Sequence, residues 1–137
     1  MSPVPAKTIK EIFSLEGGDA PSAAERADAA SRVYEKLLAQ LSPLLGVNGV
    51  RALLGRSARL RKAEFAFLAD PTVVESAERL HAALRELAPD AASAAAEGLF
   101  GTFCALITTF IGERLTAEVL RTAWPPLDEL ASKEIAK

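Results

Sequence analysis

The sequence has few of the side chains on which most protein chemistry depends. Its 137 residues include one cysteine, one histidine, one tyrosine and one tryptophan. A single cysteine, Cys104, cannot form an intramolecular disulfide or a metal site with several cysteine ligands. Cys104 lies in an apolar stretch, where a free thiol behaves as a small hydrophobic side chain. We therefore expect a protein of the reducing cytoplasm.

The motifs of the common enzyme classes are also missing. The chain has no nucleophile elbow, phosphate-binding loop or dinucleotide fingerprint. Its carboxylates are scattered, and only Glu97, at the edge of the apolar stretch, is a candidate buried base. A formal net charge of −2 gives no overall attraction to nucleic acid or to an anionic membrane. We expect no catalytic activity, no metal site and no resident cofactor.

Alanine is abundant, at 27 residues, and runs of alternating β-branched residues are absent. This composition predicts an all-α protein, with a single-domain bundle of five or six helices over residues 21–137. Residues 1–20 contain early prolines and the breaker segment EGGDAP, and they lack the apolar core of a signal peptide. They are expected to form a flexible tail, unless Ile12, Phe13 and Leu15 dock on the domain.

Capping residues and prolines predict where the helices begin and end. Ser22 and Glu25 have the spacing of a capping box, and Pro43 is expected to end or bend the first long helix near Ser42. Asp70 before Pro71 is typical of a cap followed by the first helical position. Further helices are expected from Asn48 or Gly49 to Leu68, from Asp70 to Pro89, from Asp90 to Gly112, from Thr116 to Trp124, and over a short last segment with Leu127, Leu130 and Ile135.

The segment Gly98–Gly112, GLFGTFCALITTFIG, contains no charge over fifteen residues. A membrane span needs about 20 mostly apolar residues, and charged residues follow this segment at once, so we expect no membrane span. We interpret it as part of a central helix at about residues 91–112, surrounded by the other helices or forming half of a dimer interface. Gly98 and Gly101 would let a neighbouring backbone approach closely.

The same helix could instead line a ligand pocket. Phe100, Phe103 and Phe110 recur along one face at helical spacing. His81, the only histidine, borders the apolar stripe of the preceding predicted helix. A pocket formed by these four residues is the alternative to a solid core, and His81 is more often a partly buried histidine with one hydrogen bond than a ligand.

The C-terminal part of the chain carries a resemblance to bacterial globins. A histidine, His81, is followed by a proline, a long apolar helix and an alanine–tryptophan pair that ends at Trp124, as in the proximal half of that family. The resemblance implies a haem-binding sensor with His81 as its iron ligand. The sequence departs from the family at Pro125–Pro126, which would break the last globin helix, and in lacking a phenylalanine some forty residues before His81.

The segment RALLGRSARLRK concentrates positive charge, with Arg51, Arg56, Arg59, Arg61 and Lys62. Such a cluster could contact phosphates. No aromatic residues alternate with these cations and no recognition helix follows a glycine turn, so the pattern argues against nucleic acid. The cluster of positive charge is equally consistent with a solvated helix face or with binding to an acidic protein partner.

Two segments, LSPLLGVNGVRALLGRSARLRKAEFAFL and FGTFCALITTFIGERLTAEVLRTAWP, resemble stretches of uncharacterised small helical proteins of bacteria. That resemblance implies an all-helical cytoplasmic module and no particular activity. The first hypothesis is therefore a non-enzymatic regulatory or protein-interaction module that forms a homodimer. Its candidate contact residues lie on the apolar helix, on the basic segment (Arg51, Arg56, Arg59 and Lys62) and at Trp124. A ligand or haem sensor and a nucleic-acid-binding protein are the alternatives.

Overall fold

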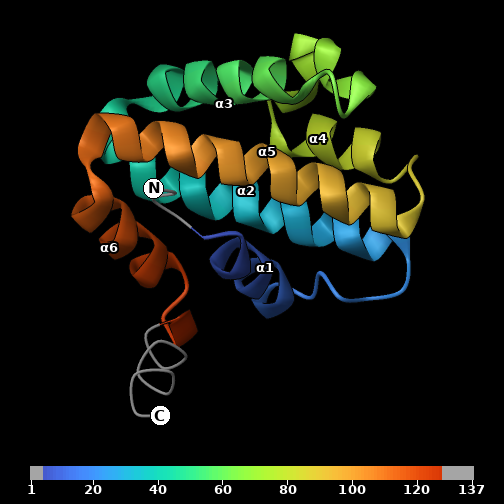
Figure 1. Cartoon of the computed structure of the whole chain (residues 1–137), viewed down its shortest axis with the longest axis horizontal. Helices are drawn as coiled ribbons and strands as arrows, with labels where there is room; N and C mark the ends of the chain where they lie inside the picture. The colour runs from blue at the N-terminus through green and yellow to red at the C-terminus, as the bar shows by residue number, and fades with distance from the viewer. Residues whose placement is uncertain (1–4, 128–137) are drawn as a thin grey trace.

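The computed structural model describes residues 5–127, and these residues form helices and no strand (Figure 1). The prediction of a small all-α bundle is confirmed. The predicted last helix with Leu130 and Ile135 lies outside the described residues. In chain order the elements are α1 (Ala6–Leu15), α2 (Ala23–Leu45), α3 (Val47–Arg61), the short 3-10 helices η1 (Ala66–Ala69) and η2 (Pro71–Val74), α4 (Ala77–Leu84), α5 (Pro89–Ile111) and α6 (Glu113–Ala123).

Helix α2 lies at the centre of the bundle and contacts every other described α-helix. Helix α5 crosses the molecule beside it, with α3 along one flank and α1 along the other (Figure 1). Helix α5, the predicted central helix, likewise contacts every other described α-helix, and of its residues from Gly98 to Phe110 only Thr109 and Phe110 are exposed. By length and composition α5 is the one described helix that could cross a membrane, and less than half of its most apolar window is buried.

Local capping signals decide several helix ends. The hydroxyl of Ser22 accepts the N–H of Glu25 at 3.1 Å and donates to its carboxylate at 2.8 Å, so Ser22 is the N-cap of α2. Pro43 does not end α2 at Ser42, since it lies in the last turn and the helix continues to Leu45.

The region between α3 and α4 differs from its prediction. The second long helix ends at Arg61 rather than Leu68. Asp70 caps as expected, accepting the N–H of Thr72 at 3.0 Å, but it begins only the short helix η2. The next α-helix begins after Ser76, whose hydroxyl accepts the N–H of Arg79. A second cap six residues after the first therefore divides the predicted helix in two.

Residues 6–20 are not a flexible tail, which corrects the predicted domain boundary. Helix α1 buries Ile9, Ile12 and Phe13, and the ring of Phe13 lies 5.9 Å from that of Phe100 on α5. The turn after α1 connects it to α2 through Gly17, which has a φ of 85°. Leu15, the last residue of α1, stays exposed.

Two sharp corners define one end of the bundle. A single glycine separates α2 from α3, Gly46 with a φ of 76°, and another separates α5 from α6, Gly112 with a φ of 88°. L-amino acids with a side chain rarely adopt this conformation. Figure 1 shows both corners at the same end of the molecule, the end toward which α5 runs.

Alanine at Gly112 is expected to lower the free energy of unfolding by about 1–2 kcal/mol, because Cβ would clash at this positive φ. Alanine at Gly55, inside α3, is expected to raise it by about 0.5–1 kcal/mol, since an added Cβ meets no atom within 4 Å and alanine favours the helix. Urea denaturation followed by circular dichroism measures both changes. Equal destabilisation by the two substitutions would contradict this account of the corner.

Candidate functional site

The structure does not bring the four predicted pocket residues together. Phe100 and Phe103 are fully buried in the core, whereas Phe110 is 66% exposed. His81 lies on α4, and its Nε2 is 2.6 Å from the Asp28 carboxylate on α2. These positions correct the pocket hypothesis. The face of α5 that carries the first two phenylalanines is packed solid, and Phe110 lies one turn beyond Ile107, the last buried residue of the helix.

The residues present do not fit a haem site. An axial histidine needs a ring nitrogen directed at an apolar cavity, and Nε2 of His81 instead pairs with a surface carboxylate. The phenylalanines that would flank a haem fill the core instead. Within residues 5–127 no three His, Cys, Asp or Glu side chains gather in a way that could hold a metal ion.

Cys104 is buried on α5, and burial raises the pKa of its thiol to about 12. A thiol with this pKa stays protonated near neutral pH, and the protonated form is a weak nucleophile. In the folded chain Cys104 therefore behaves as a small core residue, which is the expectation from its apolar sequence context.

Trp124 was predicted to contact a partner, but its side chain is only 2% exposed. Its indole Nε1–H donates to Oε2 of Glu16 at 2.7 Å. The same carboxylate pairs with Lys36 Nζ at 2.5 Å and with Arg32 Nε at 3.3 Å, and Arg32 also donates to the Glu16 carbonyl oxygen. This network joins the end of α1 to α2 and to the end of α6. Sequence reasoning missed it, because Glu16 precedes two glycines and looks like a solvated loop residue.

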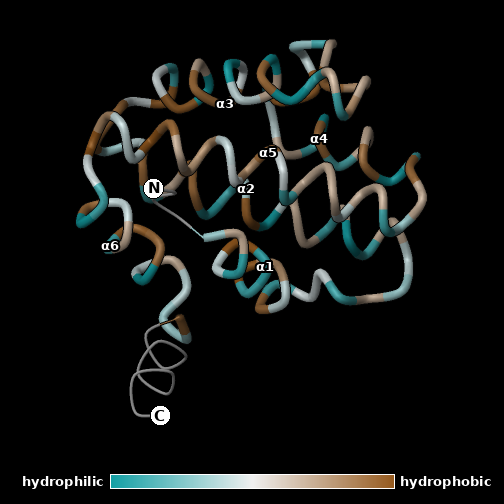
Figure 2. The backbone as a smooth tube through the Cα atoms, in the orientation of Figure 1, coloured by the Kyte–Doolittle hydropathy of each residue, from teal (hydrophilic) through white to brown (hydrophobic). Residues whose placement is uncertain are grey.

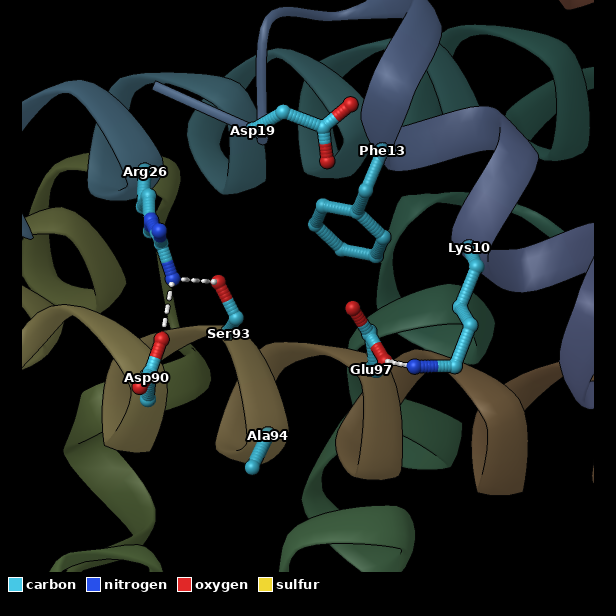
Figure 3. Close-up of a pocket in the computed structure, with 9 residues that line it drawn as sticks. Lys10, Phe13, Asp19, Arg26, Asp90, Ser93, Ala94 and Glu97 are labelled. Atoms are coloured by element: carbon cyan, nitrogen blue, oxygen red, sulfur yellow. Dashed lines mark hydrogen bonds and ion pairs between the residues drawn. The ribbon is translucent and has the colours of Figure 1, made fainter. Parts of the chain in front are cut away.

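A cleft of about 330 Å³ lies between α1, the beginning of α2 and the beginning of α5 (Figure 3). Arg26 donates to Asp90 at 3.0 Å and to Ser93 at 3.2 Å on one side of it. Lys10 pairs with Glu97 at 3.3 Å on the other side. These four charged groups therefore have partners within the cleft walls, and Glu97 is held as an ion pair at the protein surface.

A second cleft, of about 290 Å³, lies between α1 and α3 over the middle of α5. Its floor is formed by small residues that include Gly98 and Gly101. A Cβ at Gly98 would lie 2.8 Å from the ring of Phe65, and the nearest atom to one at Gly101 is Ile9 at 4.0 Å. The absence of a side chain at Gly98 thus lets the side chain of Phe65 approach α5 closely, whereas the sequence had suggested the close approach of a neighbouring backbone.

Large exposed apolar side chains gather at the end of the bundle with the two glycine corners. Leu44 at the end of α2, Val47 at the start of α3 and Phe110 at the end of α5 are 49%, 42% and 66% exposed. We call these three residues the apolar end. Figure 2 shows that α5 is hydrophobic where it approaches this end. The next charged residues along the chain are Glu113 and Arg114, adjacent and exposed at the start of α6.

The outer surface of α3 has the opposite character. Arg51, Arg56, Arg59 and Lys62 are exposed, and we call these four residues the basic face. Arg61 differs from them, because it is turned towards α5, bonds to Glu64 at 3.1 Å and lies 5.7 Å from the centre of the Phe65 ring.

Comparison of the chain with protein families, with curated proteins and with solved structures finds no match.

Proposed function

We propose that this chain is a non-enzymatic interaction module that associates with a second copy of itself through the apolar end. The observation that carries the proposal is the exposure of Phe110 at the same end of the bundle as the exposed Leu44 and Val47. A phenylalanine side chain transferred from water to a protein interior contributes about 1.5–3 kcal/mol. Exposed apolar groups that cluster, rather than occur singly, are typical of interaction surfaces.

A second copy fits this surface because the surface is self-complementary. In a two-fold dimer the same patch meets itself, so three apolar side chains from each chain bury one another. Glu113 and Arg114 lie next to each other beyond the patch, and a two-fold axis lets each meet the opposite charge of the other chain. No charged residue interrupts the chain from Gly98 to Gly112.

The chemistry of the clefts supports a binding role over a catalytic one. The carboxylates of Asp90 and Glu97 are held in ion pairs with Arg26 and Lys10, and the Cys104 thiol is protonated and buried. None of these groups is presented to a substrate as an activated base or nucleophile. A cytoplasmic location remains the expectation from the sequence.

The proposal predicts a dimer whose formation depends on Phe110. Light scattering coupled to size exclusion should give twice the chain mass for the wild type. The variant F110E should elute as a monomer at the same concentration, because two carboxylates would be buried against each other. The matched control is L60E, which places the same charge on another large exposed residue, 56% exposed, at the far end of α3. This control should remain dimeric.

Two results would contradict the proposal. One is a wild-type chain that stays monomeric up to about 1 mM, the concentration at which even a weak association of about −4 kcal/mol becomes visible. The other is a dimer that F110E leaves intact. If the monomer instead sediments with lipid vesicles and F110E does not, the apolar end binds a membrane and the second copy is the wrong occupant.

A further inference from the structure

The positive charge of this protein is concentrated on one helix. Residues 47–63, which span α3 and the turn after it, contain five basic residues and no acidic residue. The whole chain carries a net charge of −2, so the remaining residues carry −7. Helix α3 lies along one edge of the bundle, with its outer surface open to solvent (Figure 1). The molecule therefore presents one positive edge on an otherwise acidic body.

Most cations of the basic face have no internal partner. Arg56, Arg59 and Lys62 form no ion pair with any residue in the part of the chain that the structure describes. Other cations of the protein form ion pairs: Arg26, Arg32 and Lys36 each bind a carboxylate. Arg51 differs from its neighbours, because its charge acts on the Tyr34 hydroxyl and opposes the rise in pKa that burial causes there.

An apolar anchor lies beside this charge. Leu60 is 56% exposed, and its spacing of four residues from Arg56 makes these two side chains neighbours on the helix surface. An added Cβ at Gly55 meets nothing within 4 Å, so no other element covers the side of α3 on which Gly55 lies. The outer surface is a strip about 22 Å long, from 15 residues at about 1.5 Å each. A partner helix of similar length could lie along it.

We propose that the basic face of α3 binds an acidic amphipathic helical segment of another protein. The carboxylates of that segment pair with Arg56, Arg59 and Lys62, and one of its apolar side chains packs on Leu60. Charge complementarity provides orientation and association rate, and the contact with Leu60 provides an apolar core. This surface is separate from the apolar end, so the proposal does not depend on self-association.

Two features favour an acidic protein segment over nucleic acid or a lipid surface. A duplex or a membrane extends beyond α3 and would approach the acidic remainder of the chain, whereas one helix contacts only the basic strip. The exposed positions of α3 also include no aromatic residue on which a base could stack.

The test measures binding of a fluorescein-labelled helical peptide of glutamate, alanine and leucine to the full-length protein by fluorescence anisotropy. We expect binding that weakens as salt rises and disappears when each glutamate of the peptide is replaced by glutamine. The variant R56E/R59E should reduce the affinity by at least about tenfold. The control R79E/R85E changes the net charge equally at α4 and the residue that follows it, where both arginines are also exposed, and should change the affinity less than about twofold.

Replacing Leu60 tests the apolar contact with the peptide separately from the charges. L60A should weaken binding of the peptide about three- to tenfold while leaving its salt dependence unchanged, because it removes apolar contact and no charge. Circular dichroism establishes that each variant is folded. Absence of peptide binding up to about 1 mM overturns the proposal. The proposal is also overturned if a short DNA duplex or phosphatidylserine vesicles bind more tightly than the peptide and R56E/R59E abolishes that binding.

Discussion

Replacing Phe103 with alanine is expected to lower the free energy of unfolding by about 3–5 kcal/mol. The Phe103 side chain is 0% exposed and belongs to the core between α5 and the helices behind it. Its removal loses the transfer free energy of the ring and leaves a cavity that the packed neighbours cannot fill. A chain of this size has a total stability of about 5–15 kcal/mol, so the variant should be close to unfolding at room temperature.

The control for this prediction is F110A, the same substitution two turns later on the same helix. Because Phe110 is 66% exposed, its loss should change the unfolding free energy of the monomer by less than about 0.5 kcal/mol. Urea denaturation at low protein concentration, followed by circular dichroism, compares the two without a contribution from association. Similar losses for F103A and F110A would show that the end of α5 is covered, which would also remove the basis of the apolar end.

This pair of residues marks the limit of what the sequence could predict about α5. The repeat of Phe100, Phe103 and Phe110 correctly identifies a helix and the side that faces the core over most of its length. A periodic pattern cannot show where the neighbouring helices end. The glycine corners turn the chain just beyond Leu44 and Phe110, so Phe110 lies outside the core although Ile111 after it still packs against the core.

Signals that act within one turn were the most reliable. The Ser22 cap of α2 and the Asp70 cap before Pro71 require only neighbouring residues, and the structure has both. The docking of α1 requires Phe13 to meet Phe100, which lies 87 positions further along the chain. A short amphipathic segment between breakers is equally compatible with a tail, so the sequence alone could not decide.

For the candidate site, too, the sequence predicted local features but not contacts between distant helices. Exposure of Arg56, Arg59 and Lys62 was predictable, because a helix with one apolar face directs its charges to solvent. The partners of His81 and Trp124 were not, since Asp28 and Glu16 come from other helices. Trp124 looked like an interface residue because tryptophan is enriched there. Its polar N–H instead found a buried acceptor within the chain.

Replacing Glu16 with alanine is expected to lower the free energy of unfolding by about 3 kcal/mol. The hydrogen bond from Trp124 to this charged acceptor contributes about 1.5–3 kcal/mol, and its loss leaves a buried indole N–H without a partner. Lys36 and Arg32 add at most about 1 kcal/mol each, because both side chains are nearly half exposed. Trp124 is the single tryptophan, so its fluorescence reports the change directly.

The pH dependence of stability distinguishes the carboxylate from other contacts in the network. Burial raises the pKa of Glu16, but hydrogen bonds from Lys36 and Trp124 and the charges of Lys36 and Arg32 outweigh burial and hold its pKa below the ordinary 4.5. A group whose pKa is lowered on folding stabilises the folded state above its unfolded pKa. The contribution of Glu16 is therefore complete above about pH 4.5 and is lost as the pH falls through its lowered pKa.

The variant E16Q separates charge from hydrogen bonding. Glutamine keeps an acceptor for the Trp124 N–H but cannot pair with Lys36 and Arg32, so its cost at pH 7 should be smaller than that of alanine. The difference in stability between wild type and E16Q should shrink as the pH falls below about 4.5, because the wild-type carboxylate then takes up a proton. Other acids titrate in both proteins and cancel in the difference. A difference that stays constant down to pH 3 would mean that the Glu16 carboxylate does not join α1 to α6 through its charge.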